Sequence, residues 1–161
     1  MDMLVRLYAI EDATQRLRAA LADDVLIRRA MSHERADIIE WVRQNFPREA
    51  RPWGSEVAVA LSRVPAGCYI AVRGEEMLGF ACHDATAPGF FGPTGTAESE
   101  RGQGIGAALL VSTLQGMRAA GHAYAIIGGV GEHVRGFYEK AVGAVAIDGS
   151  TPGIYARPVS L

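Results

Sequence analysis

Apolar residues recur along the chain at two spacings that alternate from one segment to the next, and short stretches of glycine and proline separate these segments. A spacing of three and four residues predicts helices over 10–21, 32–46, 103–120 and 132–143, the second of them capped by Ser32. Short apolar runs bounded by turn residues predict strands between these helices. The predicted strands cover 3–8, 25–30, 68–72, 77–84, 89–97, 123–130, 144–148 and 153–159. This order of elements predicts a mixed α/β fold.

The segment between the second helix and the third strand fits more than one structure. Pro47 and Pro52 end the preceding helix, so we interpret 47–54 as a loop. The run 55–62 has the apolar content of either a strand or a helix. Ser55 as a cap, with Glu56 in the first turn, favours a short helix.

Length, charge and cysteine content exclude several classes of protein. A chain of 161 residues suits a single domain, 1–161, with a core of its own. The net charge is −2 and the arginines are scattered, which argues against nucleic acid or an anionic membrane as a partner. Cys68 and Cys82 lack CxxC spacing and the four histidines show no i, i+4 pairing, so we expect neither a disulfide framework nor a metal site.

The N-terminal segment carries no basic region followed by an apolar core, as a secretory leader would. No apolar run approaches the roughly 20 residues that span a bilayer. We therefore expect a soluble protein of the cytoplasm, with no membrane partner.

Glycines at 102, 104 and 106 stand directly in front of the long predicted helix, in the stretch "ERGQGIGAALL". A glycine-rich loop between a strand and a helix N-terminus is a general anion site, because unpaired N–H groups and a partial positive charge meet there. A dinucleotide-binding fold does not fit, since the strand 123–130 has no acidic residue for a ribose, and no Gly-Lys-Ser/Thr of a P-loop is present. The alternative is a turn that needs glycine only for close packing.

The context of these glycines resembles the GNAT superfamily of N-acetyltransferases. Arg101-x-x-Gly104-x-Gly106 after a strand matches the signature of that family, "MLGFA" is similar to its third strand, and "FYEKAVGA" to its late helix. The resemblance covers 25–155 and implies a mixed, mostly antiparallel central sheet flanked by helices. It leaves the strand and helix within 1–23 as an N-terminal addition.

The resemblance also implies acetyl-CoA as cosubstrate, with no metal. The main chain of the glycine loop would surround the pyrophosphate, and the strand edge at 94–97 would pair with the pantetheine arm as an added strand. The acetyl thioester would lie between "TGTA" and "AIIGG". The residues that the resemblance assigns to the cofactor are Thr94, Gly95, Thr96, Ala97, Arg101, Gln103, Gly104, Ile105, Gly106 and Ala107.

Acetyl transfer needs a proton for the departing thiolate, and the matching position in "FYEK" makes Tyr138 the expected general acid. The alternative is a core residue, because Val134, Phe137, Tyr138 and Ala141 have the spacing of a buried helical stripe.

The general base stays open between His83, Asp84 and Glu56. Relatives often carry a glutamate on the strand before the pyrophosphate loop, where this chain has Phe90. Strand alternation places His83 and Asp84 on opposite faces, so either could face the acceptor. A water chain is a further alternative. A second departure is Gly131, where many relatives have an asparagine that bonds the pantetheine arm.

The expected function is direct acetyl transfer to the primary amine of a small molecule, such as an amino sugar or an amino acid. Five aromatic residues lie in segments that, by resemblance, surround the acceptor: Phe46, Trp53, Phe90, Phe91 and Tyr155. The missing strand carboxylate keeps a second hypothesis open, a non-catalytic acyl-CoA-binding or sensing module. Assembly as a homodimer is also open.

Overall fold

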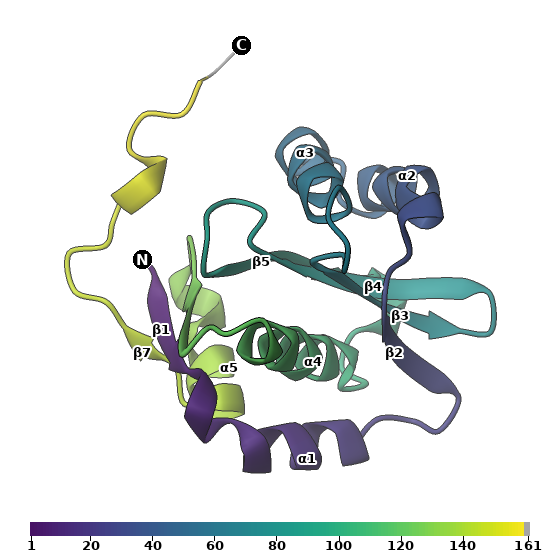
Figure 1. The fold of residues 1–161 in the computed structure, drawn as a ribbon, viewed down its shortest axis with the longest axis horizontal. Coiled ribbons are helices and arrows are strands. Elements are labelled where there is room, and N and C mark those ends of the chain that lie inside the picture. Colours follow the sequence, from purple (N-terminus) through teal and green to yellow (C-terminus); the bar gives the residue numbers. More distant parts are fainter. Residues whose placement is uncertain (160–161) are drawn as a thin grey trace.

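The computed structural model describes residues 1–159, in which seven strands form one sheet in the order β2-β3-β4-β5-β6-β1-β7 (Figure 1). Neighbouring strands are antiparallel, except that β5 and β6 are parallel. The predicted α/β class with a mostly antiparallel sheet is confirmed. The strands are β1 (Met3–Arg6), β2 (Val25–Arg29), β3 (Cys68–Arg73), β4 (Glu76–His83), β5 (Phe90–Thr96), β6 (Tyr124–Ile127) and β7 (Val145–Ala146).

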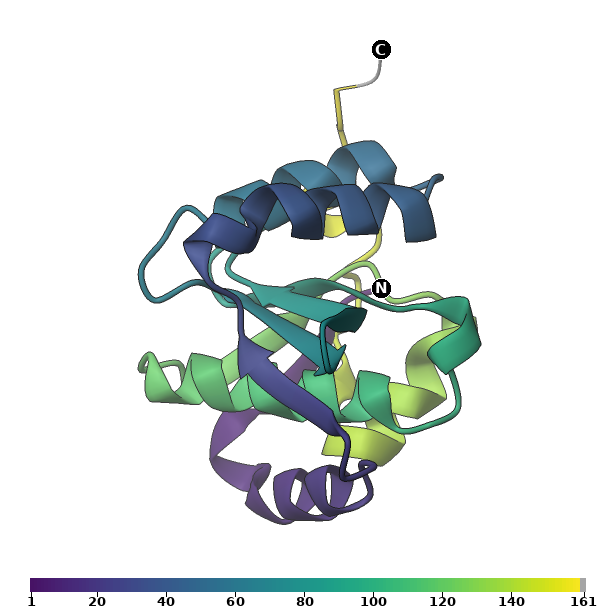
Figure 2. The ribbon, with the colours of Figure 1, turned by 90° about the vertical axis from the view of Figure 1, so that its right-hand side faces the viewer.

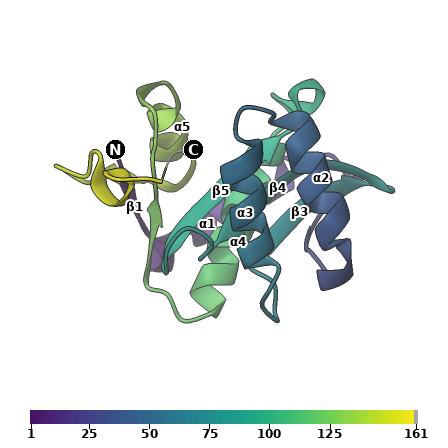
Figure 3. The same ribbon diagram turned by 90° about the horizontal axis from the view of Figure 1, so that it is seen from above.

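Helices cover both faces of the sheet (Figures 1 and 2). On one face lie α2 (Arg35–Asn45) and α3 (Ala50–Ala60), which run next to each other when the molecule is seen from above (Figure 3). On the other face, α4 (Ile105–Ala119) packs against β3, β4 and β5, and α1 (Glu11–Ala19) packs against α4. The last helix, α5 (Glu132–Val142), lies near α1 on the same side.

Side-chain alternation along β4 divides the interior into two cores. Phe80 and Cys82 belong to the core beneath α2 and α3, whereas Ala81 belongs to the core around α4. Successive side chains of a strand point to opposite faces, so one strand contributes to both layers. Leu109 and Leu114 of α4 are fully buried in the second core.

The segment from 32 to 60 differs from the prediction. Ser32 lies in a 3₁₀ turn and does not cap α2, which begins at Arg35. The expected loop over 47–54 is largely wrong, because α3 already begins at Ala50 and contains Ser55, whose hydroxyl donates to the Arg51 carbonyl at 3.0 Å. Pro52 fits there because the N–H groups of a first helical turn have no intrahelical partner.

The predicted last strand, 153–159, is also wrong. This segment contains a 3₁₀ turn at Gly153–Tyr155 and pairs with no strand. The N-terminal strand β1 instead lies inside the sheet, between β6 and β7. β1 is therefore an integral part of the sheet.

None of the helices described within residues 1–159 has the length and apolar character needed to cross a lipid bilayer.

An ion pair between Arg28 and Glu34 connects β2 to the start of α2. The Arg28 guanidinium donates to both carboxylate oxygens of Glu34, at 2.5 and 2.9 Å, and the Glu34 carboxylate also accepts the Met31 N–H at 2.8 Å. These hydrogen bonds, led by those from Arg28, lower the pKa of Glu34 to about 2. The ionised carboxylate therefore stabilises the folded state above the pKa of an unfolded glutamate, and this contribution is lost as the pH falls towards 2.

We predict that Glu34→Gln lowers the free energy of unfolding at pH 7 by about 1 kcal/mol, because the charge-assisted pair is lost. The difference from the unsubstituted protein should shrink as the pH falls from about 5 to about 2. Chemical denaturation at several pH values measures this. Glu40→Gln is the matched control, because the Glu40–Arg43 pair is exposed and 3.8 Å long. If Glu34→Gln lowered the free energy of unfolding by the same amount at every pH, the charge of Glu34 would not be the source of the stabilisation.

Candidate active site

The parallel strands β5 and β6 separate soon after they meet. They pair only at Phe90 with Ile126 and at Phe91 with Ile127. Beyond this point β5 continues to Thr96 with β4 as its partner on one side. Within residues 1–159 no strand pairs with the other side of Gly92–Thr96. This open backbone edge can accept an extended ligand as an added strand.

A groove of about 960 Å³ follows this open edge. Thr94, Gly95 and Thr96 line it from β5, and Arg101 extends this side towards the start of α4. The opposite side consists of Phe137 and Tyr138 of α5 together with nearby residues of the same helix, and the segment from Asn45 to Glu49 closes it above. We call this space the outer groove.

A second cavity, of about 370 Å³, lies at the inner end of this groove and is called the inner cavity here. Its lining comes from α3, the loop after β4, the first half of β5, the loop after β6, α5 and the C-terminal segment. The two spaces share Trp53, Thr94, Val134 and Tyr138. A ligand that occupies the outer groove therefore reaches the inner cavity beside Tyr138.

The glycines before α4 are required by their backbone conformation. Gly102 and Gly104 have φ values of +79° and +81°, and no atom lies within 4 Å of the position where a Cβ would stand. The packing interpretation of these two glycines is therefore wrong. The third, Gly106, lies in the first turn of α4, where a Cβ would meet only the Thr96 hydroxyl oxygen at 3.4 Å.

The start of α4 presents unpaired N–H groups. Gly104 stands at the N-cap position and no side chain caps the helix. In the described chain the N–H groups of Ile105, Gly106 and Ala107 have no hydrogen-bond partner, and the first intrahelical bond runs from the Ala108 N–H to the Gly104 carbonyl at 3.0 Å. Such a helix start with open space above it suits an anion.

The charges next to this loop also favour an anion. Arg73 pairs with Glu100 at 3.0 Å and with Asp24 at 3.0 Å, so the carboxylate of Glu100 has a cationic partner. Gln103 donates a hydrogen bond to the same Glu100 at 3.2 Å. Arg101 forms no ion pair with any described residue, and its guanidinium is available to a ligand in the outer groove.

Tyr138 lies where the outer groove meets the inner cavity. Its ring is half-buried and contacts that of Phe137, with 5.1 Å between the ring centroids. Burial raises the pKa of Tyr138, so the phenol is protonated at neutral pH. Within the described chain its hydroxyl has no hydrogen-bond partner. The expected buried stripe is only partly correct, because Phe137 is 43% exposed and lines the outer groove.

Of the three base candidates, Glu56 is the one that lines the inner cavity. Its carboxylate oxygen Oε1 accepts a hydrogen bond from the Thr86 hydroxyl, which belongs to the loop between β4 and β5. Neither His83 nor Asp84 is among the residues that line either space.

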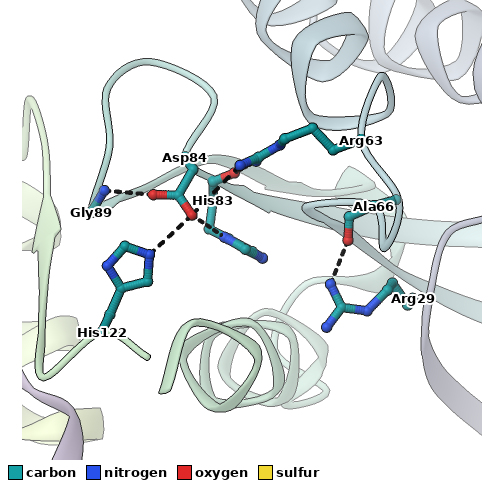
Figure 4. Close-up of polar contacts among 7 residues, drawn as sticks. All are labelled: Arg29, Arg63, Ala66, His83, Asp84, Gly89 and His122. Atoms are coloured by element: carbon teal, nitrogen blue, oxygen red, sulfur yellow. Dashed lines mark hydrogen bonds and ion pairs between the residues drawn. The ribbon is translucent and has the colours of Figure 1, made fainter. Parts of the chain in front are cut away.

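His83 and Asp84 contact each other instead of pointing to opposite faces, contrary to the expectation from strand alternation (Figure 4). β4 ends at His83, and Asp84 has a φ of +51°, so the alternation stops before it. The His83 ring points towards α4, and its Nδ1 lies 2.7 Å from Asp84 Oδ2. Asp84 Oδ2 also lies 3.3 Å from His122 Nε2, and Asp84 Oδ1 accepts the Gly89 N–H at 2.5 Å.

The directions of the pKa shifts of His83 and Asp84 both favour the contact between their side chains. Burial lowers the pKa of His83, so the imidazole is neutral at pH 7. Burial alone would raise the pKa of Asp84, but the Gly89 N–H and the His83 ring outweigh it, and the carboxyl stays ionised. The pair therefore anchors both ends of the loop that carries Thr86, and neither residue lines the inner cavity.

Residues 30–144 match the sequence profile of the acetyltransferase (GNAT) family. The chain belongs to the GNAT family.

Solved structures share its fold. The GCN5-related glucosamine N-acetyltransferase region of a fungal multi-domain GH3 β-N-acetylglucosaminidase aligns with a TM-score of 0.65 and 14% identity, over 88% of this chain and 19% of that one. A GNAT acetyltransferase from Brucella melitensis in complex with acetyl-CoA aligns with a TM-score of 0.53 and 22% identity, over 70% of this chain and 80% of that one. A structure from Desulfovibrio desulfuricans ascribed to the same family aligns with a TM-score of 0.54 and 23% identity, over 73% of this chain and 83% of that one. No match was found among curated protein sequences.

The residues that the sequence assigned to the site fall into three groups. Thr94, Gly95, Thr96 and Arg101 line the outer groove, whereas Gly104 to Ala107 form the start of α4. Among the aromatic residues, Trp53, Phe91 and Tyr155 line the inner cavity and Phe46 lines the outer groove. Phe90 lines neither space and packs beside Gly128.

Sequence reasoning missed Thr86, which holds Glu56 from a position 30 residues away. Nothing in the local sequence marks it, because the contact depends on how α3 and the loop after β4 come together. Gly131, where a family asparagine was expected, is the N-cap residue of α5, and a Cβ there would meet the His133 ring at 2.9 Å. In the described part of the chain, no group of three or more His, Cys, Asp or Glu side chains is placed to hold a metal ion.

Proposed function

We propose that this GNAT protein is an acetyl-CoA-dependent N-acetyltransferase that acts on the primary amine of a small molecule. The observation that carries this proposal is the path from Arg101, which precedes the start of α4, along the open edge of β5 to the inner cavity, with Tyr138 where the two spaces meet. The Brucella relative is a complex with acetyl-CoA, which supports the same cosubstrate here.

Three parts of the chain would hold acetyl-CoA. The N–H groups at the start of α4 suit its pyrophosphate, and Arg101 adds a positive charge. The open edge of Gly92–Thr96 suits the amide groups of the pantetheine arm. The thioester then reaches the inner cavity beside Tyr138, and the amine enters from the side of Glu56.

Direct transfer starts from the neutral amine, formed when the ammonium releases a proton to solvent, and then requires two further proton movements. The amine nitrogen attacks the thioester carbonyl carbon, the carbon–sulfur bond breaks, and the sulfur leaves as a thiolate. The Tyr138 phenol, whose pKa is raised by burial, supplies the proton that the thiolate takes. The Glu56 carboxylate takes the proton that the amine loses, directly or through one water molecule.

We predict that Gly106→Asp weakens CoA binding at least tenfold while the protein stays folded. An aspartate in the first turn of a helix is favourable for the helix dipole, and the space at Gly106 is open apart from the Thr96 hydroxyl. The same negative charge opposes a pyrophosphate a few ångströms away, by about 1 to 4 kcal/mol. Calorimetric titration with CoA measures the affinity and thermal unfolding checks the fold.

Gly106→Asn is the matched control, with nearly the same shape and no charge. It should keep most of the CoA affinity. If Gly106→Asp bound CoA as tightly as the unsubstituted protein, the pyrophosphate would not lie at the start of α4.

We predict that Tyr138→Phe lowers kcat by roughly 10² to 10⁴ while CoA affinity and melting temperature change little, because only the acidic hydroxyl is lost. The assay follows release of free thiol from acetyl-CoA in the presence of a substrate amine. Tyr124→Phe is the matched control, since Tyr124 is 49% exposed and lines neither space.

Full activity of a folded Tyr138→Phe variant would remove this hydroxyl from the mechanism. If the unsubstituted protein bound CoA but released no thiol with any amine, it would instead be a non-catalytic acyl-CoA-binding module.

A further inference from the structure

The inner cavity carries one kind of charge. Among the described residues that line it, Glu56 is the only Asp, Glu, Lys, Arg or His. The Thr86 hydroxyl donates a hydrogen bond to Oε1 of this carboxylate. No described residue donates a hydrogen bond to Oε2. An ammonium group is the natural partner of a carboxylate oxygen that is left free inside a cavity.

The walls around Glu56 are largely aromatic and apolar. Trp53 and Tyr155 line the cavity, and Phe91, which is 3% exposed, lies at its wall. Aromatic faces attract ammonium groups and also bury the apolar part of a ligand. The cavity therefore matches a molecule with one positive end and an apolar or aromatic body.

Tyr155 belongs to the C-terminal segment, which is hydrogen-bonded to the N-terminal residues. The Asp2 N–H donates to the Ser150 hydroxyl oxygen at 2.7 Å, and that hydroxyl donates to the Ile147 carbonyl at 2.6 Å. The Asp2 carboxylate in turn accepts the Gly129 N–H at 3.0 Å. These bonds hold the C-terminal segment next to the loop that follows β6.

The Tyr155 ring fits there because its neighbour has no side chain. A Cβ at Gly128 would lie 2.5 Å from the Tyr155 hydroxyl oxygen. Burial raises the pKa of Tyr155, with smaller contributions from Asp2 and Glu56, so its phenol is neutral at pH 7. β1 occupies the sheet position next to β6, and the C-terminal segment lies outside the sheet (Figure 1). Tyr155 of this segment lines the cavity.

We propose that the acceptor is a small primary amine with an apolar or aromatic body and no negatively charged group, that Glu56 binds its ammonium, and that Tyr155 limits its size. This inference rests on the proposed acetyltransferase function and names the acceptor class. It disfavours the amino acids expected from the sequence, because their carboxylate would face Glu56 in a cavity with no basic side chain among its described lining.

Pairs of amines that differ by one carboxylate test the charge requirement. Tyramine and tyrosine share a ring and an amine, as do phenethylamine and phenylalanine. We expect kcat/KM for the member without a carboxylate to exceed that of its partner at least about 100-fold, as for a buried charge left unpaired. Glu56→Gln should reduce this ratio at least tenfold, whereas Glu40→Gln, on the exposed side of α2, should leave it unchanged.

A second comparison tests the role of Tyr155. Tyr155→Ala should raise the KM for phenethylamine. It should also raise, at least tenfold, the ratio of kcat/KM for a bulkier amine such as 2,2-diphenylethylamine to kcat/KM for phenethylamine. Ile154→Ala is the control, because Ile154 is adjacent in the chain, 56% exposed, and absent from the cavity lining.

Amine binding is also measured by ligand-observed NMR on the protein without CoA, so that the two proposals can fail separately. Lack of CoA binding by calorimetry would overturn the acetyltransferase function, whereas the amine preference would still be visible by NMR. Equal or tighter binding of the carboxylate-bearing amines, or a preference that Glu56→Gln does not alter, would overturn the acceptor class. An unchanged size preference in Tyr155→Ala would overturn the role of Tyr155.

Discussion

The site depends on the separation of β5 and β6 after two paired positions. Two local features of the sequence account for it. Pro93 has no N–H to donate to a neighbouring strand, and Gly129, just beyond the end of β6, has a φ of +65° that turns the chain away. The separation leaves one backbone edge of β5 open, and the outer groove and the inner cavity both lie along it. A sheet that continued its pairing through Thr96 would have neither space.

The N-terminal strand and the C-terminal segment hold β6 and the loop after it in place, on the side of the opening away from β5. β1 pairs with β6 from Met3 to Arg6 and so holds β6 in the sheet although β5 pairs with it so briefly. Asp2, next in the chain, bonds both the loop after β6 and the segment that carries Tyr155. The profile match to the GNAT family begins at residue 30, so this support lies outside the part of the chain by which the family is identified.

Most of the fold could be predicted from the sequence, because helical and strand periodicities are clear from β3 to α5. The errors have physical causes. Pro52 was interpreted as a helix breaker, although a proline in a first turn loses no intrahelical bond. The alternation of β4 was extended to Asp84, whose positive φ ends it. The glycine loop and Tyr138 could be singled out as candidates because their motifs are local, whereas the Thr86–Glu56 contact and the position of β1 depend on long-range packing that no local pattern contains.

Hydrogen exchange of the β5 amides, followed by NMR with and without CoA, tests the central claim most directly. The claim is that the open edge of Gly92–Thr96 and the first turn of α4 bind the cosubstrate. The account predicts that saturating CoA slows exchange at least about tenfold at the amides of this edge that have no partner in β4, and at Ile105, Gly106 and Ala107. Tight CoA binding that leaves exchange at both places unchanged would contradict it.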